Sequence, residues 1–247
     1  MKPEIMICDS SGDVSRKAAE LFAKLAREAI DARGVFTVAL SGGSTPRVTY
    51  ARLSEEPYYS RIPWERVQFF WGDERSVPPD HPESNFRMAN ECLVSHIPIP
   101  PENVHRMQAE DLNLERAVTA YEEQIRTVFK LGPGESPQFD LIMLGLGEDG
   151  HTASLFPSSE ALNEMKRLVV ATYVDRLGAY RMTVTYPVLN DARCILFLAP
   201  GLSKAELLRK VLQGPHDPTR LPSQAIKPKQ GSLIWMIDQD AASLLQR

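Results

Sequence analysis

Cysteine is scarce in this chain, and its distribution excludes the usual cysteine-based scaffolds. The sequence holds three cysteines, Cys8, Cys92 and Cys194, which lie far apart and in no C-x-x-C spacing. An odd number of widely separated thiols does not form a disulfide framework, and the spacing fits no zinc or redox motif. We therefore expect reduced thiols in a cytoplasmic protein, with Cys8 and Cys194 buried inside apolar, strand-like runs.

Long apolar runs and an excess of basic residues are also missing. No stretch reaches the roughly 18 apolar residues of a membrane-spanning helix, so no membrane partner is expected. The opening residues lack the charged-then-apolar layout of a signal peptide, which favours a cytoplasmic location. The chain has 28 Lys and Arg against 32 Asp and Glu, a net charge of −4. We therefore expect no nucleic-acid partner, and a small anionic substrate would need a local cationic pocket.

Metal-binding and serine-nucleophile motifs are missing as well. His81, His96, His105 and His216 have no partner residue at a ligand spacing, so surface or capping positions are the better interpretation. Because no H-x-x-x-H or carboxylate-rich pattern occurs, we expect no metal and no cofactor. Ser154 does not lie in a G-x-S-x-G motif, which excludes the usual serine-hydrolase turn.

Strand-like and helix-like patterns alternate along the whole chain. The apolar residues Ala18, Phe22 and Ala29 recur at helical spacing, whereas residues 35–40 are apolar throughout and indicate a buried strand. Strands are predicted at residues 4–8, 35–40, 66–71, 139–144, 167–173, 181–185, 193–198 and 233–237. Helices are predicted at 14–32, 46–53, 85–94, 114–129, 204–212 and 241–246, with Ser84 and Ser203 as caps. This alternation predicts an α/β fold, a mostly parallel sheet with helices on both faces. No linker divides it, so we expect a single domain over residues 1–247.

The most informative stretch is the loop at residues 145–157, which follows a predicted buried strand. It contains three glycines, which permit tight turns, and it places Asp149 two residues before His151. In an open α/β sheet, ligands bind where loops leave the carboxyl ends of strands. A carboxylate beside an imidazole fixes the imidazole tautomer and raises its basicity. Two interpretations are open: a catalytic pair, or an Asp-Gly turn before a helix that begins near His151.

A second loop, after the strand predicted at residues 35–40, has the properties of an anion site. Its residues are Ser41, Gly42, Gly43, Ser44 and Thr45. Exposed backbone N–H groups, hydroxyls and the start of a helix all attract anions. Thr45 suits the capping position of that helix, because Pro46 suits its first turn. The G-K-S/T of a Walker loop is missing, and the alternative is an ordinary turn between strand and helix.

Three cations stand near the ends of predicted elements. Arg75 follows a strand and suits an oxyanion or phosphate, or it forms a surface ion pair with Asp73 or Glu74. Arg181 starts a predicted strand. Lys204 lies in the first turn of a predicted helix, where its charge opposes the helix dipole and a bound anion would remove the conflict.

In combination, these motifs resemble those of one enzyme family. They read L-S-G-G-S-T-P at 40–46, W-G-D-E-R-x-V-P at 71–78 and G-x-G-E-D-G-H-T-A-S-L-F-P at 145–157, with R-M-T-V-T at 181–185 and G-x-x-K-A at 201–205. Over almost the whole chain, the sequence resembles the 6-phosphogluconolactonases of the glucosamine-6-phosphate isomerase/6-phosphogluconolactonase family.

The resemblance implies a Rossmann-like α/β fold and a hydrolase. The reaction that it implies is hydrolysis of 6-phospho-D-glucono-1,5-lactone to 6-phospho-D-gluconate, the second step of the oxidative pentose phosphate pathway. It implies that His151 is the catalytic base, with Asp149 nearby. It also implies that Arg75, Arg181, Lys204 and the loop 41–45 handle the phosphosugar lactone. We expect a monomer or a weak homo-oligomer.

Two other functions fit parts of the pattern. The related isomerases share the anion loop and the Asp-Gly-His core, but they typically carry Asp-Glu-Tyr at residues 73–75 and a different segment at 152–157. A non-catalytic sugar-phosphate sensor would need a DNA-binding module, and no spare segment supplies one. The residues at 177–180 lack the prolines that the lactonases often carry, which leaves the shape of that loop open.

Overall fold

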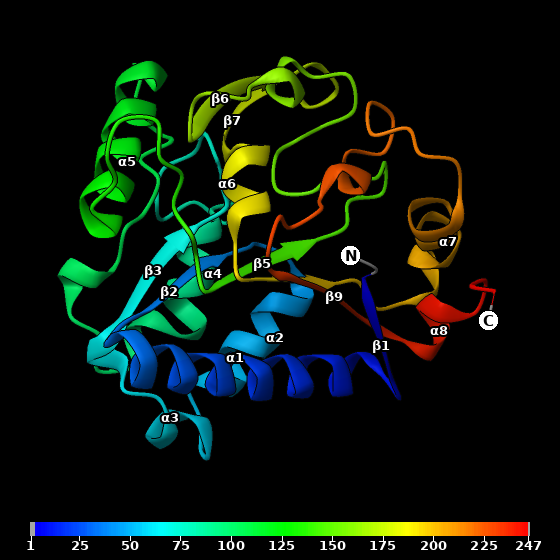
Figure 1. Ribbon diagram of the computed structural model, residues 1–247, viewed down its shortest axis with the longest axis horizontal. Coiled ribbons are helices and arrows are strands. Elements are labelled where there is room, and N and C mark those ends of the chain that lie inside the picture. Colours follow the sequence, from blue (N-terminus) through cyan, green and yellow to red (C-terminus); the bar gives the residue numbers. More distant parts are fainter. Residues whose placement is uncertain (1–2, 247) are drawn as a thin grey trace.

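The computed structural model describes residues 3–246 and arranges their strands in two sheets (Figure 1). The larger sheet is parallel throughout, with the strand order β1-β9-β8-β5-β2-β3. Its strands are β1 (Glu4–Cys8), β2 (Phe36–Leu40), β3 (Val67–Trp71), β5 (Leu141–Gly145), β8 (Cys194–Leu198) and β9 (Ser232–Asp238). The smaller sheet is antiparallel, in the order β4-β7-β6, and comprises β4 (Asp73–Arg75), β6 (Val169–Val174) and β7 (Ala179–Val184).

Helices cover both faces of the larger sheet. They are α1 (Ser11–Arg33), α2 (Ser44–Leu53), α3 (Tyr58–Arg61), α4 (Asn85–Cys92), α5 (Leu114–Phe129), α6 (Tyr186–Asp191), α7 (Ala205–Gln213) and α8 (Gln239–Ala242). In Figure 1, α1 and α2 lie below the sheet, and α6 lies above it with the hairpin of β6 and β7. The predicted fold class, a mostly parallel sheet with helices on both faces, is confirmed.

Successive residues of the central strands face two separate cores. In β5, Leu141 and Met143 pack on the α1 side, whereas Ile142 and Leu144 pack with α5, α6 and α7. A strand buried on both faces has no polar side to show, which explains the unbroken apolar runs of the sequence. Cys8 is fully buried in the core on the α1 side, as its apolar surroundings in the sequence predicted.

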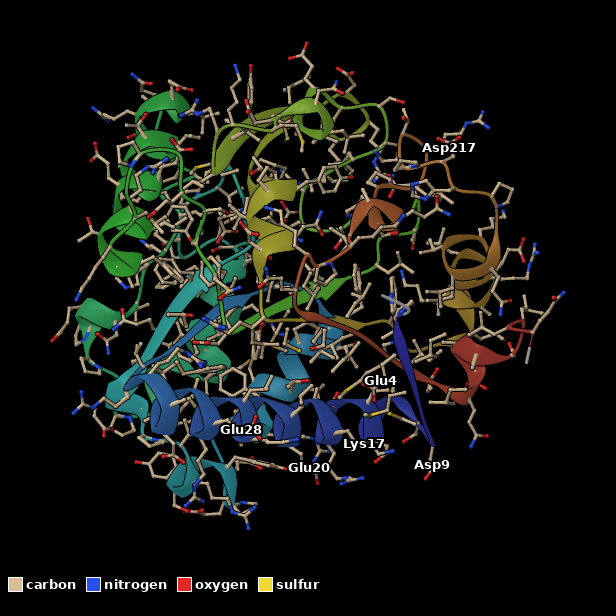
Figure 2. The ribbon with its side chains drawn as sticks, viewed as in Figure 1. Glu4, Asp9, Lys17, Glu20, Glu28 and Asp217 are labelled. Carbon is tan, nitrogen blue, oxygen red and sulfur yellow. The ribbon has the colours of Figure 1, made fainter. Side chains whose placement is uncertain are left out.

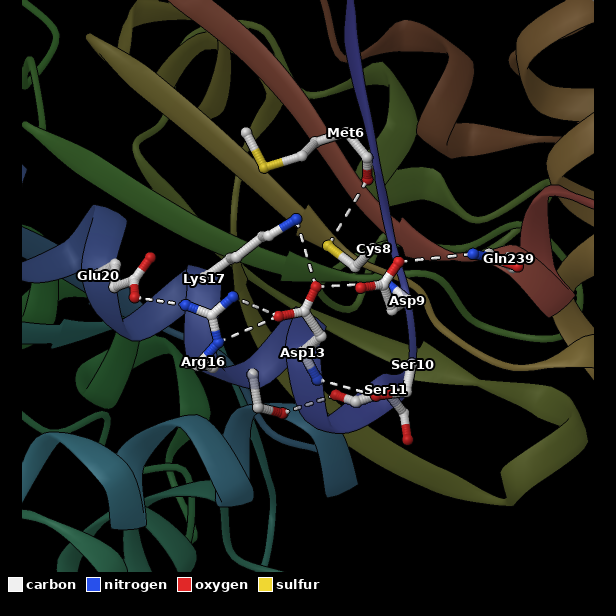
Figure 3. A network of polar contacts seen from close by, with 11 residues as sticks. Met6, Cys8, Asp9, Ser10, Ser11, Asp13, Arg16, Lys17, Glu20 and Gln239 are labelled. Carbon is white, nitrogen blue, oxygen red and sulfur yellow. Dashed lines mark hydrogen bonds and ion pairs between the residues drawn. The ribbon is translucent and has the colours of Figure 1, made fainter.

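The first helix is held by local polar contacts at its exposed start. Ser10 caps α1, because its side chain accepts a hydrogen bond from the backbone N–H of Asp13. The guanidinium of Arg16 forms ion pairs with Asp13, one turn earlier in the helix, and with Glu20, one turn later (Figure 3). Glu20 and Glu28, labelled in Figure 2, are exposed. Exposed ion pairs of this kind contribute little to stability, so the buried face of α1 holds the helix in place.

The smaller sheet corrects the prediction for the residues after β3. Residues 73–75 form β4 rather than a loop, and β6 and β7 pair with each other instead of entering the parallel sheet. Arg181 is therefore the third residue of β7 and does not start the strand. Next to β4, the carbonyl of Gly72 accepts a hydrogen bond from the backbone N–H of Val184 at the end of β7. Local sequence patterns do not reveal a contact between residues so far apart in the chain.

Two predicted helix starts were also wrong, and so was the alternative of a helix after His151. Thr45 is not a cap: α2 begins at Ser44, and Gly43 precedes it with a φ of 111°, a conformation that favours glycine. The residues after His151 form turns instead of a helix, since the hydroxyl of Thr152 donates back to the carbonyl of Gly145. Lys204 precedes α7 rather than lying in its first turn, because a 3₁₀ turn intervenes.

Two buried tyrosines hold the carboxyl ends of β2 and β3. The hydroxyl of Tyr50 donates to the carbonyl of Ser41 (2.9 Å) and accepts from its N–H (3.0 Å). The hydroxyl of Tyr121 contacts the carbonyl and N–H of Trp71 in the same way, at 3.0 and 2.9 Å. Burial raises the pKa of both phenols, so they stay protonated. These contacts fix the points from which two loops leave the sheet.

Replacing the first of these tyrosines tests its role. In Tyr50→Phe, the backbone N–H and carbonyl of Ser41 stay buried without a partner, so we expect the free energy of unfolding to fall by about 1–3 kcal/mol. Tyr58→Phe is the matched control, because Tyr58 is also buried but its hydroxyl makes no hydrogen bond within residues 3–246. Urea unfolding measures both variants, and equal losses in the two would contradict the role of the Tyr50 hydroxyl.

Candidate functional site

The loops singled out in the sequence meet in one cleft at the carboxyl ends of β2, β3 and β5. The cleft has a volume of about 390 Å³ and is lined by Ser41, Gly42, Gly43, Asp73, Arg75, Asn85, Gly145, Leu146, Gly147, His151, Ala153, Ser154, Phe156, Arg176, Leu177 and Arg181. Among the described residues that line it, six were predicted as site residues: Ser41, Gly42, Gly43, Arg75, His151 and Arg181. One cleft therefore gathers the anion loop, the imidazole and two arginines.

Four predicted residues lie outside this lining. Asp149 stands behind His151 and contacts its ring. Ser44 and Thr45 form the first turn of α2, directly after the cleft residue Gly43. Lys204 precedes α7, after β8, the strand that neighbours β5. Of the three predicted cations, Arg75 and Arg181 line the cleft and Lys204 does not.

The sequence left open whether Asp149 and His151 touch, and the structure joins them directly. Nδ1 of His151 lies 2.5 Å from Oδ1 of Asp149, which also accepts the backbone N–H of His151 at 3.1 Å. Burial favours a raised pKa for Asp149, but hydrogen bonds and charge from His151, together with Arg176, lower it to about 2. An ionised Asp149 requires the imidazole proton on Nδ1. The lone pair of the neutral imidazole is then on Nε2.

The backbone of the Asp–His loop, residues 145–157, is shaped around the imidazole. A Cβ atom at Gly147 would lie 2.0 Å from ring atoms of His151, so only glycine leaves room for the ring. The N–H of Gly147 donates to the carbonyl of His151 at 2.9 Å and closes the turn. On its other side, the ring stacks on Phe156, with the ring centres 4.2 Å apart. The imidazole therefore has little freedom to rotate away from Asp149.

Arg176 belongs to the site, although the sequence gave no sign of it. It lies in the 3₁₀ turn Asp175–Leu177 between β6 and β7. Its guanidinium is 2.9 Å from Oδ2 of Asp149 and 5.0 Å from the ring centre of Phe156. Asp149 is thus held through both oxygens, by His151 on one and Arg176 on the other. No motif marks Arg176, because a turn of the smaller sheet brings it to the cleft.

Two arginines stand directly opposite each other in the smaller sheet. Arg75 of β4 pairs in register with Arg181 of β7. Burial and then the charge of Arg75 lower the pKa of Arg181. Like charges in opposite strand positions repel each other, and an anion bound beside both would remove that cost. Within the described chain Arg75 forms no ion pair with Asp73 or Glu74, so the surface-pair alternative was wrong.

Glu74 is occupied by the start of α4. Its carboxylate accepts the backbone N–H groups of Arg75, Asn85 and Phe86, each at 2.8 Å, and the hydroxyl of Ser84 at 3.1 Å. Burial raises the pKa of Glu74, and these hydrogen bonds oppose the rise. A carboxylate at a helix start complements the helix dipole. Glu74 therefore anchors the backbone of Arg75 and leaves its guanidinium free of local carboxylates.

Asp73 joins three loops of the cleft. One carboxylate oxygen accepts the hydroxyl of Ser154 at 2.7 Å, and its backbone carbonyl accepts the amide of Asn85 at 2.9 Å. Asn85 in turn packs against Gly42, where a Cβ atom would lie 1.9 Å from the Asn85 side-chain oxygen. The second half of the Asp–His loop, the start of α4 and the anion loop are thereby held together. Sequence analysis assigned no such role to Asp73, Asn85 or Ser154.

The cleft offers an imidazole and cationic side chains to a ligand. Within residues 3–246, no group of three or more His, Cys, Asp or Glu side chains has the arrangement of a metal site. In the same part of the chain, every helix is too short or too polar to cross a bilayer.

An imidazole with a free Nε2, set beside two arginines and a loop of exposed N–H groups, suits an anionic substrate that is attacked by water.

Comparison with known proteins agrees with the motifs. The family described as "Glucosamine-6-phosphate isomerases/6-phosphogluconolactonase" matches residues 9–235. The chain is 43% identical to a 6-phosphogluconolactonase of Synechocystis sp. over 219 residues, 89% of this chain and 88% of that protein. It is 38% identical to one of Nostoc sp., with 99% of each covered. The solved structure of 6-phosphogluconolactonase from Trypanosoma cruzi is similar, with a TM-score of 0.87, 29% identity, and coverage of 100% of this chain and 98% of that one.

The close approach at Gly147 is testable by adding one methyl group. In Gly147→Ala, the new Cβ would lie 2.0 Å from the His151 ring, so we expect the ring to leave Asp149 and the low-field Nδ1 proton to vanish from the NMR spectrum. Gly145→Ala is the matched control in the same loop, because its Cβ would meet no atom within 4 Å. A retained Nδ1 signal in Gly147→Ala would show that the ring position does not depend on this glycine.

The lowered pKa of Asp149 predicts a specific pH dependence of stability. The folded pKa of about 2 lies below the ordinary value, so ionised Asp149 stabilises the fold above about pH 4, and this contribution is lost as the pH falls toward 2. We expect wild type to exceed Asp149→Asn by about 1–2 kcal/mol in free energy of unfolding at pH 6. Urea unfolding at several pH values should show the difference shrinking below pH 4, and a difference that stays constant down to pH 2.5 would contradict the assignment.

Proposed function

The chain belongs to the family of glucosamine-6-phosphate isomerases and 6-phosphogluconolactonases, and from that premise we propose that it hydrolyses 6-phospho-D-glucono-1,5-lactone to 6-phospho-D-gluconate. The proposal rests most on one observation: His151, fixed by Asp149, faces a cleft that also holds Arg75 and Arg181. The reaction is the one named for the relatives in Synechocystis and Nostoc. This hydrolysis is the second step of the oxidative pentose phosphate pathway.

In the proposed mechanism, water is the nucleophile and His151 is the base. Nε2 takes a proton from water while the water oxygen attacks C1 of the lactone. Asp149 stabilises the imidazolium that forms, as an ionised carboxylate does in related pairs. The Arg75 guanidinium stabilises the negative charge on the carbonyl oxygen. When the C1–ring oxygen bond breaks, the imidazolium returns its proton to the departing oxygen, and the base is restored.

The phosphate would be held at the anion loop. The N–H groups around Gly43 precede α2, whose first turn carries Ser44 and Thr45, so the helix dipole favours a negative group there. The Ser41 hydroxyl is buried and has no partner within residues 3–246, which suits a contact with substrate. We propose that Arg181 and Lys204 complete the phosphate site. Binding energy from this remote group positions C1 for attack.

The isomerase alternative is weakened by two features of the cleft. Arg75 stands where the isomerases typically carry tyrosine, and it lines the cleft opposite Arg181. The segment at residues 152–157, which also differs from theirs, is tied to Asp73 through Ser154. A sensor without turnover would not need the paired carboxylate and imidazole. These features favour hydrolysis over isomerisation or simple binding.

Two substrates distinguish the candidate functions. With fresh 6-phosphogluconolactone, we expect the purified protein to release acid well above the spontaneous rate. With glucosamine 6-phosphate, we expect no ammonia. Ammonia release would establish the isomerase, and saturable binding of both compounds without turnover of either would establish a sensor; each result would refute the proposal.

The base assignment is tested by His151→Gln, which keeps a polar side chain but removes the base. We expect kcat for the lactone to fall about 100-fold or more, the scale of general-base loss, with KM changed only a few-fold. His96→Gln is the control, because His96 is exposed and lies outside the cleft lining. An unchanged kcat in His151→Gln would exclude His151 as the base.

A further inference from the structure

A second cavity lies behind the Asp–His loop. We call it the α7 cavity: it has a volume of about 270 Å³ and is bounded by the end of α7, the 3₁₀ turn Pro222–Ala225 and β9. None of the residues that line it lines the catalytic cleft. Its volume is below the roughly 300–1,000 Å³ of sites for larger organic ligands, so it suits a molecule with a single ring.

The walls of the α7 cavity are apolar and firmly held. Val211, Ile226, Leu233 and Trp235 line it. Trp235 is stacked on Phe197 with a centre-to-centre distance of 3.8 Å and an angle of 4°. The indole is only 1% exposed and offers little surface to a ligand, whereas Leu212 and Leu233, which also line the cavity, are partly exposed. An apolar lining in a cavity of this volume suits a small ring.

One polar group in this wall has no partner. Ser223 is 2% exposed and lines the cavity, yet its hydroxyl makes no hydrogen bond within residues 3–246. The adjacent Gln224 shows the contrast, because its amide donates to the carbonyls of Lys210, Val211 and Pro215. A buried hydroxyl without a partner carries a cost that a ligand atom can remove. The cavity therefore contains an apolar wall and a buried hydroxyl that has no partner within residues 3–246.

Lys227 carries a positive charge at the α7 cavity, which favours an anion. His216 and Lys227 line it and are exposed, whereas none of the lining residues is Asp or Glu. A carboxylate on a bound ring would accept the Ser223 hydroxyl and face these two side chains. Charge-assisted hydrogen bonds of this kind are stronger than neutral ones.

A backbone hydrogen bond joins this cavity to the Asp–His loop. The backbone N–H of Ser223 donates to the carbonyl of Gly150 at 3.0 Å. Gly150 stands between Asp149 and His151, and a Cβ atom there would lie 2.6 Å from the side chain of Leu221. The turn that carries Ser223 is therefore packed tightly against the Asp–His loop, and a shift of one would move the other.

From these contacts we propose that the α7 cavity is a second ligand site, which takes a small aromatic carboxylate and transmits its occupancy to the Asp–His loop. The ring lies against Leu212 and Leu233, and the carboxylate accepts a hydrogen bond from the Ser223 hydroxyl. The contact from Ser223 to Gly150 carries the effect to His151. The site thus provides a means by which a compound other than the substrate alters the catalytic pair.

Benzoate is the probe that tests this site. It is titrated into ¹⁵N-labelled full-length protein in the presence of inorganic phosphate, which occupies the cleft arginines. We expect saturable shifts of the backbone amides of Ser223, Lys227 and Gly150. Benzyl alcohol, which has the ring without the charge, should bind more weakly. Shifts that do not saturate, or that occur only at residues of the catalytic cleft, would overturn the site.

Two matched variants make the test specific. Ser223→Ala removes a hydroxyl that makes no hydrogen bond within the described chain, so the protein should fold normally while benzoate binds about tenfold more weakly. Ser159→Ala removes another hydroxyl without a partner that does not line the cavity, and it should bind as wild type does. Equal affinity in Ser223→Ala and wild type would overturn the proposed contact. Binding without any change at Gly150 would overturn the link to the Asp–His loop.

Discussion

The hydrogen bond between Asp149 and His151 is the interaction on which the geometry of the cleft depends. It requires a carboxylate that stays ionised and an imidazole that cannot turn. Arg176 on the second oxygen of Asp149 supports the first requirement. Gly147 beneath the ring and Phe156 against it supply the second. An imidazole whose orientation is fixed before substrate arrives needs no reorganisation at the moment of reaction, which is the advantage of a preorganised site.

The two sheets contribute different parts of this site. The parallel sheet brings the ends of β2, β3 and β5 together, and Tyr50 and Tyr121 fix two of those ends. The antiparallel sheet then carries the cations, since Arg75 and Arg181 are neighbours across β4 and β7. An apolar core thus positions the His151 imidazole, while the smaller sheet concentrates positive charge in a protein of net charge −4. The local field, rather than the overall charge, suits the cleft to an anion.

Sequence patterns predicted the parts of the fold that local forces determine. The bounds of α5, residues 114–129, were predicted correctly because Asn113 caps it and one apolar face repeats along it. The anion loop and the Asp–His pair were found because glycines and polar residues follow apolar strands. Arg176 and the role of Asp73 were missed, since both depend on contacts between segments far apart in the chain. The start of α2 was misplaced because Gly43, not a side-chain cap, sets its first turn.

The most direct measurement is a structure of the protein with 6-phospho-D-gluconate bound. If His151 is the base of a lactonase, the C1 carboxylate of this product will lie within hydrogen-bond distance of Nε2 of His151 and of Arg75. Its phosphate will then contact the anion loop, residues 41–45, and Arg181. A product bound with its phosphate at His151, or with C1 beyond the reach of Nε2, would contradict the central claim.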